Sequence, residues 1–180
     1  MKKIVRMAGV LLAFALASCT QQPQSLSIIP IPLKAELQGG AFVVNEQTQV
    51  WIDAPEADKN ILQEYLAASP LKLAVAAETP ASNAIVLKQV AELPGVESAE
   101  GYVLTATKKG VEVQAKSGAG LFYGVQTLLQ MATEGNKVAF GTITDEPRFE
   151  YRGMMLDVSR HFFGLDFVKK QIDAMAYYKL

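Results

Sequence analysis

The sequence predicts an α/β fold in which a small β-sheet domain with two helices is followed by a unit of one strand and one helix. Two observations lead to this prediction. Residues 26–144 alternate short strand patterns with two helical patterns. Residues 151–180 then hold a mostly apolar run, a polar loop and an amphipathic helix, in that order. A strand, a loop and a helix in succession are typical of the first unit of a parallel α/β fold.

The composition limits the classes of function. The 180 residues are 50% hydrophobic, which suits one domain of common size. With 17 basic and 18 acidic residues the net charge is −1, so no nucleic-acid partner is expected. The single cysteine excludes an internal disulfide, and the single histidine, His161, excludes a metal site built on paired histidines. No phosphate-binding glycine loop or nucleophile elbow is present, so neither a metal nor another cofactor is expected.

Residues 1–19 have the pattern of a secretory signal peptide. Lys2, Lys3 and Arg6 give the segment a charged start, and residues 8–17 form an apolar core of ten residues. This core is too short to cross a bilayer, because a transmembrane helix needs about 20 apolar residues. The segment is therefore predicted to be removed from the mature protein.

The signal segment ends at the only cysteine of the chain. Residues 16–19 (Leu-Ala-Ser-Cys) resemble a bacterial lipobox, in which cleavage precedes the cysteine and its thiol receives a diacylglycerol. This resemblance implies lipidation at Cys19 and a lipoprotein of the cell envelope, anchored in the outer membrane and facing the periplasm or the exterior. Residues 20–26 are mostly polar and are expected to form a flexible tether. The alternative is an ordinary signal peptide whose cleavage site happens to precede a cysteine.

The predicted elements of the sheet domain, residues 27–146, follow one another closely. Residues 27–32 (SIIPIP) are expected to be extended, because each proline biases the residue before it away from the helical region. Lys108-Lys109-Gly110 separates two alternating runs and predicts a hairpin. The predicted strands are residues 41–44, 49–52, 84–88, 101–107, 111–115 and 138–143, and the predicted helices are residues 57–68 and 118–131.

The last unit occupies residues 147–180. Residues 151–158 are predicted to form a buried strand, and from Phe167 to Leu180 apolar residues recur at helical spacing. Neither Gly nor Asn follows this helix, so no cap is expected at its end. In parallel α/β units the loop after the strand carries the chemistry, because it lies at the carboxyl end of the sheet or barrel.

Several strings of residues resemble one enzyme family. Residues 147–149 (PRF), 151–162 (YRGMMLDVSRHF) and 175–180 (MAYYKL) resemble the start of the catalytic barrel in family 20 glycoside hydrolases, the β-N-acetylhexosaminidases. Residues 29–32, the hairpin and residues 118–130 (GAGLFYGVQTLLQ) resemble the accessory domain that precedes this barrel. The resemblance implies an accessory domain that supports the barrel, followed by the first strand and helix of a truncated (β/α)8 barrel.

Arg160 is the main candidate for binding substrate. It lies just past the carboxyl end of the predicted strand, and a guanidinium grips hydroxyls with fixed, forked donors. The resemblance implies that Arg160 contacts the 3- and 4-hydroxyls of a bound N-acetylhexosamine. Asp157 is expected to orient Arg160, and His161 is expected to support the site without acting as acid or base. Arg152 lies at the start of the strand, where barrels serve stability, and is expected to pair with Asp145 or Glu150.

The resemblance implies the N-terminal portion of an exo-acting β-N-acetylhexosaminidase, which removes terminal N-acetylhexosamine from glycans by substrate-assisted, retaining hydrolysis. In that family the catalytic Asp-Glu pair lies well beyond the segment that residues 147–180 resemble, so no catalytic residue is assigned and the chain is expected to be inactive alone. One alternative is a complete, non-catalytic lipoprotein that binds sugar or a partner surface. Another is a related hexosaminidase family, because similar domains precede other glycosidase barrels.

Overall fold

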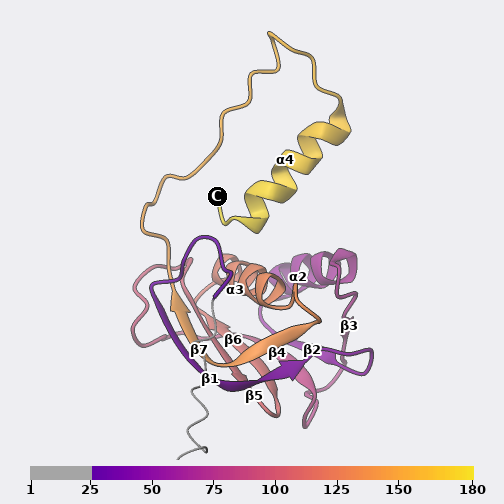
Figure 1. Ribbon diagram of the computed structural model, residues 1–180, viewed down its shortest axis with the longest axis vertical. Helices are drawn as coiled ribbons and strands as arrows, with labels where there is room; N and C mark the ends of the chain where they lie inside the picture. Colours follow the sequence, from indigo (N-terminus) through magenta and orange to yellow (C-terminus); the bar gives the residue numbers. More distant parts are fainter. Residues whose placement is uncertain (1–25) are drawn as a thin grey trace, which may run out of the picture.

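The computed structural model describes residues 26–180, and the predicted signal peptide with Cys19 lies outside the described residues. One seven-stranded mixed sheet forms the larger part, with the strand order β1-β7-β5-β6-β4-β2-β3. Two helices, α2 (Glu56–Ala68) and α3 (Gly118–Met131), cover one face of this sheet (Figure 1). The strands are β1 (Lys34–Val43), β2 (Gln49–Asp53), β3 (Ala74–Val75), β4 (Ala84–Gln89), β5 (Tyr102–Thr107), β6 (Gly110–Ala115) and β7 (Lys137–Asp145).

The centre of the sheet follows from the alternation of its residues. β5 and β6 form the predicted antiparallel hairpin, with Thr107 opposite Gly110. Along β5 the buried residues are Tyr102, Leu104 and Ala106, while those between them are only partly buried. Such alternation places one face of the sheet against the helices. β4 pairs with β6 on one side and with β2 on the other, so the predicted strand at residues 84–88 is confirmed and lies inside the sheet.

The edge strand β1 is longer than its sequence pattern predicts. It begins at Lys34 and not at residue 41, and most of its residues are exposed, so it lacks the alternation that marks a half-buried strand. Its pairing with β7 shifts register between Leu37 and Ala41. Opposite this irregularity lies Gly141, whose φ of +138° is a conformation that glycine adopts and other residues rarely do. The irregularity therefore requires glycine at this position of β7.

Both predicted helices of the sheet domain are confirmed. In α2 the inward side chains are Leu62 and Leu66, whereas Ile61 is exposed to solvent. Ser117 directly precedes α3 and caps it, because its hydroxyl accepts a hydrogen bond from the backbone N–H of Gly120 at 3.2 Å. A Cβ atom at Gly124 would lie 2.3 Å from a methyl carbon of Val113, so this glycine lets α3 lie close to β6.

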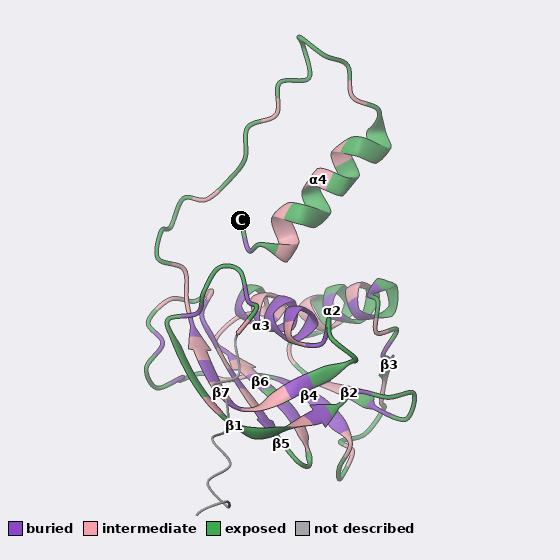
Figure 2. Ribbon diagram, viewed as in Figure 1, coloured by how far each residue is buried: buried purple, intermediate pink, exposed green. Residues whose placement is uncertain are grey.

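Residues 146–180 leave the sheet domain and return to it (Figure 1). The helix α4 (Leu165–Tyr177) confirms the predicted last helix, and none of its residues is buried. The strand predicted at residues 151–158 is wrong: this stretch has no regular secondary structure, and Tyr151 is 93% exposed. A strand forms only where its backbone pairs with a neighbour, and no strand of the described chain lies beside this stretch. Figure 2 shows most of residues 146–177 as exposed.

Among the helices of residues 26–180, none combines the length and the apolar character needed to cross a membrane.

Candidate functional site

The loop that follows residue 156 is organised by Asp157. One oxygen of its carboxylate accepts hydrogen bonds from the backbone N–H groups of Ser159 (2.9 Å) and Arg160 (3.1 Å). The other oxygen lies 3.6 Å from Nε of Arg160. A short carboxylate side chain commonly closes a turn in this way, by bonding the backbone two residues on. The structure therefore brings Asp157 and Arg160 together.

The guanidinium of Arg160 faces solvent. Its side chain is 88% exposed, and the only ion pair that it makes within residues 26–180 uses Nε. An exposed pair of this kind contributes about 0.2–1 kcal/mol to stability, so it adds little to the stability of the fold. The two terminal nitrogens then remain available as a planar fork of donors for oxygen atoms of a ligand.

His161 lies next to this pair but does not join it. The residue is exposed, and its imidazole makes no hydrogen bond or ion pair within the described part of the chain. Within the same residues, no group of three or more His, Cys, Asp and Glu side chains could hold a metal ion. The loop therefore offers an exposed guanidinium as a hydrogen-bond donor, with the carboxylate of Asp157 beside it.

A second polar cluster, which the sequence patterns did not indicate, lies where the end of the chain meets the sheet. Nζ of Lys179 donates to the hydroxyl of Tyr102 at 2.7 Å and lies 3.2 Å from a carboxylate oxygen of Asp145. The Tyr102 hydroxyl donates to the same oxygen at 3.0 Å. Burial lowers the pKa of Lys179, against the opposing effect of the Asp145 charge. Burial, and then the charge of Asp145, raise the pKa of the Tyr102 hydroxyl, so it stays a neutral donor.

Arg152 joins the same region to the loop before β5. Its Nη2 lies 2.7 Å from a carboxylate oxygen of Glu100 and donates to the Tyr123 hydroxyl at 3.2 Å. Its Nε donates to the backbone carbonyl of Lys179 at 3.0 Å. The prediction that Arg152 pairs with Asp145 or Glu150 is therefore wrong. Asp145 is already held by Lys179, and Glu100 reaches Arg152 through the fold from 52 positions away in the sequence.

The end of α4 is capped, contrary to the prediction. The N–H of Leu180 donates to the carbonyl of Met175 at 2.9 Å, and the N–H of Lys179 donates to that of Ala176 at 3.1 Å. These two bonds form a Schellman motif, in which the residue past the helix takes a left-handed conformation. Lys179 has a φ of +61°, although glycine usually fills this position. The hydrogen bonds of its buried amine to Tyr102 and of its backbone carbonyl to Arg152 hold Lys179 in this conformation.

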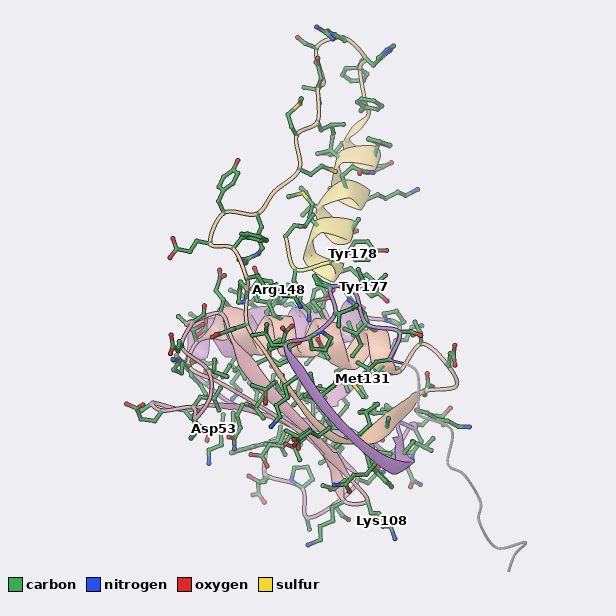
Figure 3. The ribbon with its side chains drawn as sticks, turned by 60° about the vertical axis from the view of Figure 1, so that its left-hand side comes forward. Asp53, Lys108, Met131, Arg148, Tyr177 and Tyr178 are labelled. Carbon is green, nitrogen blue, oxygen red and sulfur yellow. The ribbon has the colours of Figure 1, made fainter. Side chains whose placement is uncertain are left out.

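The end of α4 also contacts the sheet domain through its backbone. The carbonyl of Tyr177 accepts a hydrogen bond from the side-chain amide of Gln130 on α3, at 2.8 Å. Figure 3 shows Tyr177 and Tyr178 at the end of α4 that faces the sheet domain, with Arg148 where the chain leaves β7. The loop with Arg160 lies at the opposite end of α4.

These features define a class of protein: an α/β protein in which a seven-stranded sheet domain is followed by an irregular segment and then by a helix. The family can be named from the comparisons. The pattern of glycosyl hydrolase family 20, domain 2, matches residues 25–146, and that of the family 20 catalytic domain matches residues 149–180. The chain belongs to glycosyl hydrolase family 20, as the sequence strings predict.

Individual relatives agree with this assignment. A beta-hexosaminidase of Porphyromonas gingivalis is 34% identical over 203 aligned residues, which cover 100% of this chain and 26% of the relative. A beta-N-acetylhexosaminidase of Cellulomonas fimi is 33% identical over 172 residues, covering 86% of this chain and 33% of the relative. The chain thus spans about a quarter to a third of these two relatives.

A solved structure supports the fold. The GH20 beta-N-acetylhexosaminidase of Streptomyces coelicolor A3(2) superposes with a TM-score of 0.71 at 35% identity, over 88% of this chain and 34% of that one. The predicted α/β fold class is confirmed.

Proposed function

We propose that this chain is the N-terminal portion of an exo-acting β-N-acetylhexosaminidase, which removes terminal N-acetylhexosamine residues from glycans. One observation carries the proposal: the patterns of family 20 domain 2 and of the start of its catalytic domain match in order along the chain, over residues 25–146 and 149–180. The relatives named as hexosaminidases support the same activity. Enzymes of this family use the acetamido oxygen of the substrate as nucleophile, with retention of configuration.

In this proposal Arg160 holds hydroxyl groups of the terminal sugar. Its exposed guanidinium and its position in the loop that precedes α4 support this role. Asp157 keeps the turn closed and fixes the direction of the Arg160 side chain. The general acid and the group that orients the acetamide are not assigned to any of the 180 residues.

The acetamido group of the substrate provides the test of this function. The longer protein translated from the same coding sequence is expected to hydrolyse 4-nitrophenyl N-acetyl-β-D-glucosaminide, because the acetamido oxygen supplies the nucleophile. It should release no 4-nitrophenol above background from 4-nitrophenyl β-D-glucoside, which lacks that group. Equal turnover of both substrates would refute the substrate-assisted reaction, and turnover of neither would refute the hexosaminidase function.

We further propose that the mature protein is a lipoprotein of the cell envelope, anchored in the outer membrane through Cys19. The lipobox-like residues 16–19 after the apolar core support this proposal. A single acyl chain gives only marginal membrane binding, so stable anchoring requires two or three acyl groups on the cysteine.

Acylation can be measured by metabolic labelling with a clickable fatty acid. The wild-type protein is expected to carry the label and to sediment with membranes, whereas Cys19→Ala should lose the label because the chain has no other cysteine. Ser25→Thr is a useful control, because it changes a nearby residue outside residues 16–19 and keeps the thiol. Equal labelling of wild type and Cys19→Ala would exclude the anchor.

A further inference from the structure

The face of the sheet that α2 and α3 leave uncovered carries two rows of side chains, and we call it the open face. The two helices lie between the sheet and α4, so the open face points away from the segment that follows the sheet domain (Figure 1). Residues directly opposite each other on paired strands project to the same face. The second row has Thr144, Val103 and Gln114 at its centre. The first row is Glu36, Thr142, Thr105, Glu112, Val86 and Trp51.

The middle of the open face offers hydrogen-bonding groups that the fold does not use. The hydroxyls of Thr105, Thr142 and Thr144 are partly exposed and make no hydrogen bond within residues 26–180. The amide nitrogen of Gln114 donates to one carboxylate oxygen of Glu112, which leaves the other oxygen and the Gln114 carbonyl as acceptors. A threonine hydroxyl can both donate and accept. A ligand with many hydroxyl groups can therefore bond to this part of the face.

Trp51 gives one end of the first row an aromatic surface. Its neighbours Val50 and Ile52 are buried under the helices, so Trp51 projects to the other side, where it is partly exposed. Val86 lies directly opposite it on β4. An indole combines a broad apolar surface with an N–H donor, so it can pack against the apolar side of a sugar ring and bond to a hydroxyl.

The charges of the open face exclude an anionic polymer as its ligand. Lys34 pairs with Glu36 at 2.9 Å, and Lys88 lies opposite Asp53 in the second row. The remaining charge is the carboxylate of Glu112, so the two rows carry no excess of positive charge. A nucleic acid or an anionic membrane surface would require such an excess.

The apolar content of the open face is too small for a protein interface. The core of such an interface is apolar and poor in charged residues. Val86 and Val103 are the only aliphatic residues of the two rows, and charged residues stand at both ends of the second row. The combination of hydroxyl, amide, carboxylate and indole groups suits a neutral ligand that is rich in hydroxyls.

We propose that the open face binds a neutral glycan chain and so holds polymeric substrate on the sheet domain. The first row crosses six adjacent strands, which at about 4.8 Å per strand makes it roughly 24 Å long. A site of this length takes several sugars of an extended chain and not a single ring. The sugar class, a chain that contains N-acetylglucosamine, rests on the proposed function.

Binding can be measured through Trp51, because it is the only tryptophan of the chain. The 180-residue chain is titrated with a hexamer of β-1,4-linked N-acetylglucosamine, and separately with the monosaccharide, while tryptophan fluorescence is recorded. We expect the hexamer to change the fluorescence and to bind at least about tenfold more tightly than the monosaccharide, because its sugars make their contacts within one molecule.

The variant Thr105→Val/Thr142→Val removes two hydroxyls from the middle of the first row and keeps β-branched residues on the strands. The loss of two neutral hydrogen bonds is expected to raise the Kd of the hexamer roughly 5-fold to 100-fold. Glu112→Gln should also raise the Kd, because a carboxylate is the stronger acceptor. Its matched control is Glu64→Gln, at an exposed position of α2 on the covered side of the sheet, which should leave the Kd unchanged. Urea midpoints confirm that each variant is folded.

Three results would overturn the proposal: no change of Trp51 fluorescence with the hexamer, equal affinity for hexamer and monosaccharide, or an unchanged Kd in the folded double variant. None of these measurements depends on hydrolysis. A longer protein that fails to cleave an N-acetylglucosaminide would therefore refute the proposed function, and the titration would still decide whether the open face binds glycan.

Discussion

Gly141→Ala is expected to destabilise the sheet domain by about 3 kcal/mol or more, from backbone strain and a steric clash together. The φ of +138° lies in a region that is essentially restricted to glycine. A Cβ atom there would also lie 2.1 Å from the carbonyl oxygen of Glu36 and 2.8 Å from Cα of Leu37. Both are backbone atoms of the neighbouring strand β1, so they cannot move aside as the end of a flexible side chain would.

The measurement is urea denaturation of the chain, followed by the fluorescence of Trp51, the only tryptophan, on β2. Gly153→Ala is the matched control, because a Cβ at Gly153 meets no atom within 4 Å and its φ is not in the left-handed region. We expect a shift of less than about 0.5 kcal/mol for this control, as for an ordinary surface substitution. Equal urea midpoints for Gly141→Ala and Gly153→Ala would contradict the requirement for glycine where the register of β1 and β7 shifts.

Local patterns predicted most of the fold, because helices and hairpins depend on residues that are close in sequence. The turn at Lys108-Lys109 and the helix at residues 118–131 are such features, and both were predicted correctly. The long edge strand β1 was not, because an exposed edge shows no alternation. The strand at residues 151–158 was predicted from its apolar content, but pairing needs a neighbouring strand, which the described chain does not supply.

The difference between contacts that are local in sequence and contacts that are distant also separates the two polar clusters. The contact of Asp157 with Arg160 spans three positions, so the sequence could indicate it. Lys179 and Asp145 are 34 positions apart, and no spacing rule connects them. The sequence did not indicate the cap of α4 either. Lys179 takes the left-handed conformation there while its amine bonds to the buried Asp145, which is distant in the sequence.

Arg160→Lys is expected to impair the longer protein strongly, although the charge is kept. Hydrogen bonds that involve a charged group contribute about 1.5–3 kcal/mol each, and lysine loses the planar fork that reaches two hydroxyls at once. At about 1.4 kcal/mol per tenfold change, the loss of kcat/KM should lie between roughly 10-fold and 1000-fold. The stability of the sheet domain should not change, because the Arg160 side chain is 88% exposed.

Arg148→Lys is the matched control for this substitution. Arg148 lies in the same segment, is exposed, and makes one long hydrogen bond of 3.4 Å to the carbonyl of Ile31. The same chemical change there should leave kcat/KM within about twofold of wild type, as expected where no ion pair or substrate contact is lost. A general effect of replacing arginine by lysine in this region would instead lower kcat/KM equally in both variants.

The ratio of kcat/KM between Arg148→Lys and Arg160→Lys on 4-nitrophenyl N-acetyl-β-D-glucosaminide tests most directly whether the loop after residue 156 is the sugar-binding end of a family 20 hydrolase. Both variants are to be compared in the longer protein, with circular dichroism confirming that each is folded. Binding of the terminal sugar by Arg160 predicts a ratio of roughly 10 or more. A ratio near one, with both proteins folded and active, would contradict it.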